Sequence, residues 1–393
     1  MSLKFHWFLP TYGDSRFIVG GGHGVPAGVA GGARPATIAY LGQIARSAEQ
    51  IGFEAALTPT GAWCEDAWLM TAMLNEVSES LKFLVAFRPG LMSPTLAAQM
   101  AATFQNSSQG RLLLNIVVGG ERHEQRAYGD FLEKDDRYAR ADEWLTVVER
   151  LWAGERVTYA GKHVRVEDAH IPRLPEPLPP FYFGGSSAAA GAVAATHTDV
   201  YLTWGEPVEA VAEKIGWIRG LAEAQGRKVR FGIRLHVIAR DTAEAAWAEA
   251  QRLLDAIDPE TVAQVQAGLA RSQSEGQQRM RALHGGSKDN LVVGPNLWAG
   301  VGLVRGGAGT ALVGSHSEIA ERIKDYAAVG IEEFVLSGVP HLEEAYWFGE
   351  GVLPILKRDG LWRHPQGNGP AVSATVPFAP VGEPVAKLVA RAE

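Results

Sequence analysis

Residues 111–118 read Arg-Leu-Leu-Leu-Asn-Ile-Val-Val, and this almost entirely apolar run decides the fold class. A strand in the middle of a parallel sheet is buried on both faces, so its sequence is a continuous apolar run rather than an alternating one. Amphipathic stretches with helical spacing lie on either side, at residues 94–106 and 137–153. A strand between two helices indicates alternating β and α units, and therefore a parallel sheet.

The same alternation continues in both directions along the chain. Eight β runs are expected, at residues 4–9, 55–59, 82–88, 111–118, 181–183, 200–204, 230–239 and 333–337. Most are followed by a helical pattern, at residues 38–51, 65–77, 94–106, 137–153, 207–225, 242–256 and 317–329, with an alanine-rich helix after residue 187. Eight such units predict a (β/α)8 TIM barrel, an α/β fold. A doubly wound open sheet is the alternative.

Three segments fall outside this repeat. Residues 13–36 hold a glycine-rich insertion in which Gly-His-Gly-Val-Pro-Ala at 22–27 superficially echoes a dinucleotide fingerprint. No helix opens there, so we interpret the insertion as a loop on the active-site side. Residues 255–314 form a second insertion, and residues 358–393 form a tail with little periodicity. We therefore predict one barrel domain over residues 1–357, followed by an extended tail that contacts another subunit.

Composition narrows the function classes. A total of 37 Lys and Arg against 44 Asp and Glu gives a net charge of −7, which argues against a nucleic-acid coat. With 46% hydrophobic residues the chain can bury a core, and its single cysteine cannot form an intrachain disulfide. No apolar run reaches the ~20 residues of a membrane span, and the N-terminus does not read as a signal peptide. We expect a cytoplasmic protein without membrane contact.

Polar residues at strand ends are the candidates for chemistry, because barrel active sites lie at the carboxyl ends of the strands. Arg234 and His236 share one face of an otherwise apolar strand, since side chains alternate with a period of two. Arg305 lies in the glycine-rich loop 305–310, which permits a mobile lid that closes over an anion. Alternatively, Arg234 pairs with a structural carboxylate and Arg305 is a solvated loop residue.

A second candidate site is Gly-Gly-Ser-Ser at residues 184–187, between a strand and a helix. Glycines let the backbone approach a ligand, and amides at a helix N-terminus favour phosphate; an ordinary capped turn is equally compatible. Trp204 at another strand end could line a flat ligand, whereas Cys64 has the usual character of a small semi-buried residue. No two histidines have metal-binding spacing, so we expect no metal site. Spacing alone thus predicts a barrel that binds an anion.

Several ordered blocks of the sequence resemble one family. They are Trp-Phe-Leu-Pro-Thr at 7–11, Pro-Thr-Gly at 59–61, Cys-Glu-Asp-Ala-Trp at 64–68, Tyr-Phe-Gly-Gly-Ser-Ser at 182–187, Tyr-Leu-Thr-Trp-Gly-Glu-Pro at 201–207, Phe-Gly-Ile-Arg-Leu-His-Val at 231–237, residues 296–314 and Pro-His-Leu-Glu-Glu at 340–344. Together these blocks resemble the flavin-dependent alkanesulfonate monooxygenases, from the first strand to about residue 357.

The resemblance implies a bacterial-luciferase-like (β/α)8 barrel that receives reduced FMN from a separate NAD(P)H-dependent FMN reductase. With O2, that family oxidises the carbon bearing a sulfonate and releases sulfite and an aldehyde, and its members form homodimers or homotetramers. By motif, the resemblance places Cys64, Arg234, His236 and Arg305 at catalytic positions. It places substrate contacts at Tyr12, Trp204, Arg234, His236, Arg305 and His341, and flavin contacts at Thr60, Asn115, Tyr138, Gly185, Ser186, Ser187 and Trp204.

Two departures from the family pattern bear on the substrate. Tyr12 stands where the alkanesulfonate enzymes usually have histidine, and Val339 stands where they have tyrosine, so that hydroxyl is missing here. With the 13–36 insertion, these changes look closer to the sulfosugar branch, so sulfoquinovose is the expected substrate and 6-oxo-glucose the product. Polar residues at the mouth could serve its hydroxyls or be ordinary surface: Tyr12, Asp14, Arg16, His23 and His341.

Three alternatives stay open at this point. A straight-chain alkanesulfonate enzyme would differ only in substrate. A deazaflavin-dependent oxidoreductase of the same fold would differ in cofactor. A non-enzymatic sulfonate receptor for uptake is disfavoured, because the chain shows no export signal and its buried-strand rhythm is that of a barrel.

Overall fold

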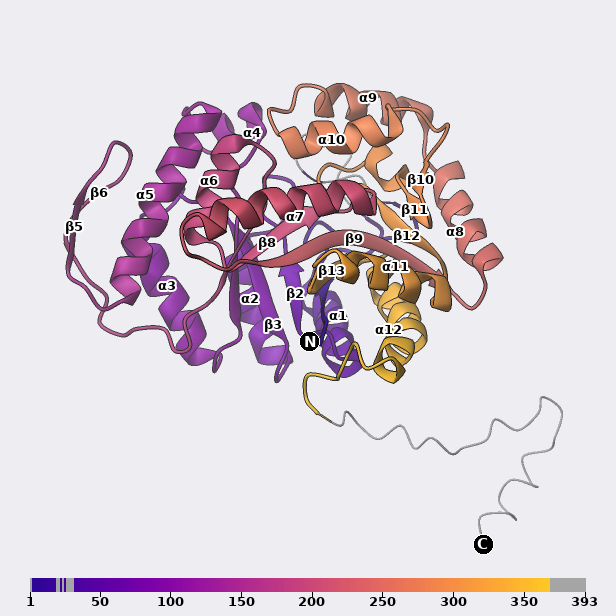
Figure 1. The fold of residues 1–393 in the computed structure, drawn as a ribbon, viewed down its shortest axis with the longest axis horizontal. Helices are drawn as coiled ribbons and strands as arrows, with labels where there is room; N and C mark the ends of the chain where they lie inside the picture. The colour runs from indigo at the N-terminus through magenta and orange to yellow at the C-terminus, as the bar shows by residue number, and fades with distance from the viewer. Residues whose placement is uncertain (1, 19–21, 23–24, 26–31, 368–393) are drawn as a thin grey trace, which may run out of the picture.

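The computed structural model describes residues 2–18, 22, 25 and 32–367, and a closed barrel of parallel strands forms its centre (Figure 1). Strand β8 pairs with β9 and so closes the ring. In order around the barrel, the strands are β1 (Lys4–Phe8), β2 (Ala55–Thr58), β3 (Lys82–Phe87), β4 (Leu112–Ile116), β7 (Phe181–Phe183), β8 (Val200–Trp204), β9 (Arg230–Arg240) and β13 (Glu333–Ser337). The predicted (β/α)8 barrel and all eight predicted β runs are confirmed, and the open-sheet alternative is wrong.

Helices pack around the outside of the barrel (Figure 1). Several begin where the sequence offers a capping hydroxyl, because Thr37, Ser93, Ser187 and Ser315 each accept a hydrogen bond from a backbone amide of the first turn. They are α1 (Ile38–Ile51), α2 (Ala67–Leu74) with the 3-10 turn η2 (Asn75–Val77), α3 (Pro94–Ser107), α4 (Arg122–Ala127), α5 (Lys134–Trp152), α6 (Ala188–His197), α7 (Val208–Glu223), α8 (Ala243–Asp255), α11 (His316–Ala328) and α12 (His341–Arg358). Helix α12 is absent from the sequence-based expectation, because Pro354 lies inside it.

The 255–314 insertion is an ordered layer beside one rim of the barrel. It comprises α9 (Pro259–Leu269), α10 (Glu275–His284), β10 (Val292–Gly294), β11 (Leu297–Trp298), the 3-10 helix η3 (Gly300–Leu303) and β12 (Ala311–Ser315). Strand β8 pairs with the first half of β9, up to Arg234, and β12 pairs with its second half, from His236 onward. Because β9 extends beyond the barrel in this way, the loop before β12 is held beside the carboxyl ends of the strands.

A few elements were not anticipated or lie outside the described residues. The exposed hairpin of β5 (Val157–Ala160) and β6 (Arg165–Ala169) interrupts the β/α rhythm, as do β10, β11 and β12. Residues 19–21, 23–24 and 26–31 of the predicted 13–36 loop, His23 included, and residues 368–393 of the tail fall outside the described residues. Within the described residues, no helix combines the length and apolar character needed to cross a membrane.

Inside the barrel, a cluster of polar side chains closes the amino end of the strands, and we call it the floor. A layer of apolar side chains lies above it, toward the carboxyl ends. The floor is centred on Glu333, which is fully buried and accepts hydrogen bonds from His6 Nε2 at 3.0 Å and from the Tyr182 hydroxyl at 2.7 Å, and pairs with Arg230. Above it lie the buried side chains of Phe8, Leu57, Leu84, Leu113 and Leu202. The floor closes the amino end of the barrel, so a ligand can enter only from the opposite end.

Candidate active site

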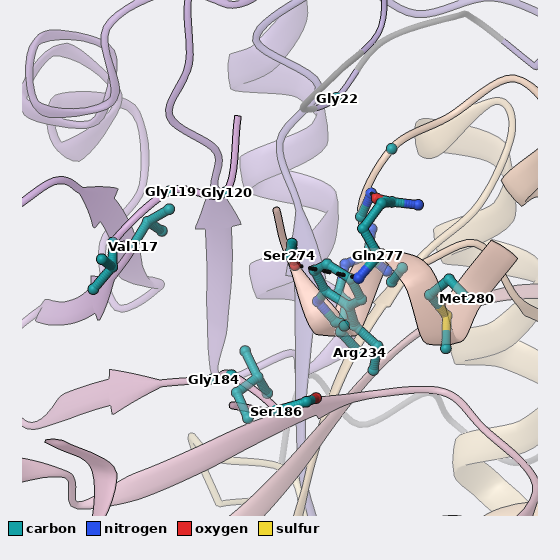
Figure 2. A pocket seen from close by; sticks show the side chains of 18 of the residues that line it. Gly22, Val117, Gly119, Gly120, Gly184, Ser186, Arg234, Ser274, Gln277 and Met280 are labelled. Carbon is teal, nitrogen blue, oxygen red and sulfur yellow. Dashed lines mark hydrogen bonds between the residues drawn. The ribbon is translucent and has the colours of Figure 1, made fainter. Parts of the chain in front are cut away.

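A cavity opens at the carboxyl ends of the strands and collects most of the predicted site residues (Figure 2). Its walls come from the ends of β4, β7, β8 and β9, from α5 and α10, and from the loop before β12. Figure 2 shows Gly184 and Ser186 after β7, and Ser274 and Gln277 from the start of α10. Ten of the thirteen predicted site residues line the cavity: Thr60, Asn115, Tyr138, Gly185, Ser186, Ser187, Trp204, Arg234, His236 and Arg305.

Two buried arginines meet in this cavity. The Arg234 side chain donates to Ser337 Oγ at 2.8 Å, and its guanidinium lies 4.7 Å from the centre of the Phe8 ring. The Arg305 guanidinium lies 4.7 Å from the centre of the Tyr12 ring. The two residues are 6% and 4% exposed, and within the described part of the chain neither forms an ion pair with a carboxylate. Burial, and then the charge of Arg305, lowers the pKa of Arg234 to about 9. Such a pair of cations is costly without an anion, so the geometry favours a bound anion.

His236 is hydrogen-bonded through both ring nitrogens. Arg234 donates to Ser337 Oγ, so the Ser337 hydroxyl proton is free to be donated to His236 Nδ1 at 2.8 Å. The ring then donates from Nε2 to the carbonyl oxygen of Ala308 at 3.2 Å. Burial, followed by the charges of Arg234 and Arg305, holds the pKa of His236 well below its usual value. The neutral ring therefore links the strand that carries Arg234 to the loop that carries Arg305.

The Arg305 loop is anchored from two more sides. The Gly307 amide donates to Gln277 Oε1 of α10 at 2.8 Å, and the Thr310 hydroxyl donates to the Gly205 carbonyl at 2.7 Å. Gly307 has a φ of +90°, a conformation that requires glycine here. Gln277 was not among the predicted site residues, because it lies in the insertion and belongs to no recognisable motif.

The turn after β7, residues 184–187, lines another part of the cavity with hydrogen-bond donors and small side chains. A Cβ on Gly184 would lie 2.2 Å from the Leu202 carbonyl oxygen, so only glycine lets the chain pass there. Ser187 caps α6 by accepting from the Ala190 amide at 3.2 Å, which aims the first amides of that helix toward the cavity. Tyr138 projects from α5 beside Ser187, and burial raises the pKa of its hydroxyl. Hydroxyl and amide donors at a helix N-terminus make a suitable site for a phosphate.

A flat wall separates the turn from the arginines. Strand β8 lies between β7 and β9 in the barrel, and its last residue, Trp204, lines the cavity. A Cβ on Gly276 would lie 3.2 Å from the Trp204 ring, so the start of α10 lies close to this indole. Asn115 at the end of β4 and Thr60 after β2 line other walls. An extended ligand with an anionic end and a planar ring therefore fits the residues present.

Cys64 is placed beside the cavity and does not line it. Its Sγ lies 3.7 Å from the Pro59 carbonyl oxygen and 3.5 Å from that of Gly61. Burial raises the pKa of the Cys64 thiol to about 12, so the group is a neutral thiol near pH 7. A role as a thiolate nucleophile has no support in this geometry.

Tyr12 and His341 do not line the cavity, although Tyr12 stacks on Arg305. His341 Nδ1 is 3.0 Å from the carboxylate of Asp14, which also accepts from the Tyr40 hydroxyl at 2.6 Å. Although burial acts in the opposite direction, the charge and hydrogen bond of His341 lower the pKa of Asp14 to about 2. Asp14, Tyr12 and His341 are buried, so the alternative that they are ordinary surface is wrong, whereas Arg16 is exposed.

Comparison with known proteins agrees with the fold. The profile of the family described as luciferase-like monooxygenase matches residues 4–333. Among similar solved structures, a riboflavin lyase with modified FMN and riboflavin has 20% identity and a TM-score of 0.77, covering 93% of both chains. A long-chain alkane monooxygenase has 19% identity and a TM-score of 0.73, over 92% of this chain and 93% of the other. An F420-dependent secondary alcohol dehydrogenase has 14% identity and a TM-score of 0.65, over 90% and 99%.

Proposed function

The chain belongs to the luciferase-like monooxygenase family, and from that premise we propose that it is a two-component flavin-dependent sulfonate monooxygenase. The reaction takes a sulfonate, O2 and reduced FMN, and yields sulfite, an aldehyde, water and FMN. Reduced FMN supplies the two electrons, one oxygen atom enters the aldehyde and the other leaves as water, and the C–S bond breaks. An NAD(P)H-dependent FMN reductase would deliver the reduced flavin.

The observation that carries this proposal is the pair of buried arginines. A sulfonate is an anion at any physiological pH, and its three oxygens suit the fork of donors that a guanidinium offers. Arg234 is fixed on a strand and bonded to Ser337, whereas Arg305 lies on the loop that His236 and Gln277 hold. Strand and loop can therefore clamp one sulfonate from two directions, and the loop excludes water from it.

We assign the flavin to the remaining walls. The N-terminus of α6, with Ser186, Ser187 and Tyr138, would hold the phosphate of FMN, since these donors converge on one end of the cavity. Trp204 and Asn115 would contact the isoalloxazine ring, because β8 and β4 flank the turn after β7. The sulfonate would then lie between the ring and the two arginines.

Within the sulfonate class we propose sulfoquinovose as the substrate and 6-oxo-glucose as the product. The basis is the sequence: Tyr12 replaces a histidine and Val339 replaces a tyrosine of the straight-chain enzymes. In the structure, Tyr12 stacks on Arg305 and Val339 packs in an apolar cluster, so the histidine and the tyrosine hydroxyl of the straight-chain enzymes are both missing at these positions.

Sulfite release tests both levels of this proposal. The protein is supplied with FMN, a flavin reductase, NADH and O2, and sulfite is measured with a panel of sulfonates. We expect sulfite from sulfoquinovose. Release from octanesulfonate but not from sulfoquinovose would refute the sugar assignment alone, whereas no sulfite from any sulfonate would refute the sulfonate monooxygenase itself.

A deazaflavin-dependent oxidoreductase is the second candidate, and the similarity to an F420-dependent alcohol dehydrogenase favours it. Anaerobic titration with reduced FMN and with reduced F420, followed through tryptophan fluorescence, separates the two. Tighter binding of F420 would favour this candidate, and tighter binding of FMN favours the monooxygenase.

We further propose a cytoplasmic homodimer or homotetramer. Helix α2 has apolar residues on all sides, and Leu69 and Met73, which share one face, are 67% and 48% exposed. Exposed apolar side chains of this size on one helix face are typical of an interface.

A further inference from the structure

An ion pair lies at the phosphate end of the cavity and is unused by the function proposed above. Lys134 Nζ is 2.9 Å from Glu275 Oε1. Lys134 is the first residue of α5 and Glu275 is the first residue of α10, and both line the cavity together with Ser186 and Ser187. The pair therefore joins a barrel helix to the insertion directly at the turn after β7.

The position of Lys134 is unusual for its own helix. A cation at a helix N-terminus meets the positive end of the helix dipole, so this residue is unfavourable for α5 in isolation. Four residues later the same face carries Tyr138, whose hydroxyl lies beside Ser187. The charge of Lys134 acts on the Tyr138 hydroxyl, and Lys134 lines the same cavity as Ser187 at the start of α6. The ammonium, the two hydroxyls and the first amides of α6 are all donors that suit one anion.

The ion pair between Glu275 and Lys134 is weak. Its side chain is 51% exposed and that of Lys134 is 25% exposed, and a pair of this kind contributes at most about 1 kcal/mol. Without Lys134, the Glu275 carboxylate would still interact favourably with the positive end of the α10 dipole, because it lies in the first turn of that helix. A phosphate at the turn would repel the carboxylate and attract the ammonium.

We propose that Lys134 is a further ligand of the phosphate monoester of the flavin, and that Glu275 is the counter-ion that the phosphate displaces. This inference rests on the proposed function, because it requires a phosphate at the turn after β7. Glu275 lies in the same helical turn as Gln277, which holds Gly307 beside Arg305. The exchange of partners therefore takes place on the helical turn that is hydrogen-bonded to the loop of Arg305.

The test compares FMN with riboflavin, which lacks the phosphate. Dissociation constants of both reduced flavins are measured anaerobically by tryptophan fluorescence for wild type, Lys134→Gln and Glu275→Gln. The matched control is Lys162→Gln, which breaks an exposed ion pair of 2.6 Å with Asp136 in the same first turn of α5, away from the cavity lining. We expect Lys134→Gln to weaken FMN about tenfold and leave riboflavin unchanged. Glu275→Gln should tighten FMN about two- to fivefold, again without effect on riboflavin.

Each outcome has one meaning. If Lys134→Gln weakens FMN and riboflavin equally, or if Glu275→Gln weakens FMN, the assignment of this pair is wrong while the phosphate turn stands. If wild type binds FMN no more tightly than riboflavin, the assignment of the phosphate to the turn after β7 is wrong as a whole. The sulfonate monooxygenase itself is then judged separately, by the release of sulfite. Lys162→Gln should match wild type, which shows that loss of an ion pair on α5 is not sufficient.

Discussion

At the scale of single residues, the buried cations determine what this cavity can hold. Arg234 and Arg305 are both almost fully buried, and burial with mutual repulsion lowers the pKa of Arg234. Ser337 and the aromatic rings of Phe8 and Tyr12 supply polar and π contacts, yet none of them carries a negative charge. This arrangement is unfavourable for the stability of the chain alone, which supports the proposal that the two arginines bind an anion.

Substitution of either arginine should separate activity from stability. Arg305→Ala and Arg234→Met should each lower sulfite release about 10²–10³-fold, because each removes a charged donor from the substrate. Arg234→Met should also raise the free energy of unfolding by about 1–3 kcal/mol, since an apolar side chain replaces an uncompensated buried cation. Sulfite assays and urea unfolding measure the two effects.

Arg219→Ala is the matched control for this pair. Arg219 is an exposed arginine that stacks on Phe231 of β9 at 5.3 Å, and it lies outside the cavity lining. Its loss should leave sulfite release unchanged. Wild-type turnover in Arg305→Ala would contradict the clamp.

The sequence predicted these residues but not their partners. The period of two in a strand was sufficient to place Arg234 and His236 on one face. It could not show that Ser337 of the neighbouring strand joins them, nor that the Asp14 carboxylate is buried behind them against His341. These contacts span 101 and 327 residues along the chain, so no local pattern encodes them.

At the scale of elements, helix α10 decides how firmly the Arg305 loop is held. Its Gln277 accepts the hydrogen bond of the Gly307 amide. The same helix is fixed to the barrel through Arg279, whose Nε lies 2.7 Å from Glu206. Helix, loop and strand β12 therefore form one unit beside the cavity.

Gln277→Leu should loosen this unit. Loss of the acceptor leaves the half-buried Gly307 amide without its partner, a cost of about 1 kcal/mol or more that favours open states of the loop. Trypsin cleavage after Arg305, followed by mass spectrometry, should then accelerate about tenfold. The control is Gln264→Leu, an exposed position on α9 whose side chain donates to Glu260 at 3.4 Å, within its own helix. Equal cleavage of both variants would contradict a role for Gln277 in holding the loop.

Helices and strands could be predicted where the local sequence pattern agrees with the position that the element takes in the fold. The eight barrel strands are largely apolar runs followed by helices, so their sequence shows their type and their approximate limits. Strands β10, β11 and β12 were missed because they lie in an insertion and form only as an extension of the sheet: β12 pairs with the far end of β9, β11 with β12, and β10 with β11. Helix α12 was missed because its interior proline is tolerated only in the folded context.

At the scale of the whole molecule, the barrel floor contributes stability that depends on pH. Burial would raise the pKa of Glu333, but the hydrogen bond and charge of His6 and the charge of Arg230 outweigh it and lower the pKa from 4.5 to about 2. The unfolded carboxyl therefore binds its proton first as the pH falls. The contribution of Glu333 is complete above pH 4.5 and is lost as the pH falls through about 2.

Glu333→Gln tests this contribution. At pH 7 it should lower the free energy of unfolding by about 3 kcal/mol, because it leaves a buried network without its anion. It should also flatten the dependence of stability on pH between 4.5 and 2, measured by urea unfolding at several pH values. The neighbouring Glu332→Gln is the control, since Glu332 is only half-buried and burial raises its pKa, the opposite direction. An unchanged pH dependence in Glu333→Gln would contradict the role of the floor.

By itself, the sequence determined the barrel, its eight strands, most of the helices around it and the residues at the strand ends. These features follow from apolar periodicity, capping residues and glycine positions, each of which acts over a few neighbours along the chain. Only the tertiary structure showed that β9 extends beyond the barrel to pair with β12, and that α10 faces the turn after β7. It also showed that Cys64, Tyr12 and His341 do not line the cavity. Most of these outcomes depend on contacts between residues far apart along the chain, such as His236 with Ala311 and His341 with Asp14. In such contacts burial and unpaired charge, rather than local preference, determine which side chains meet.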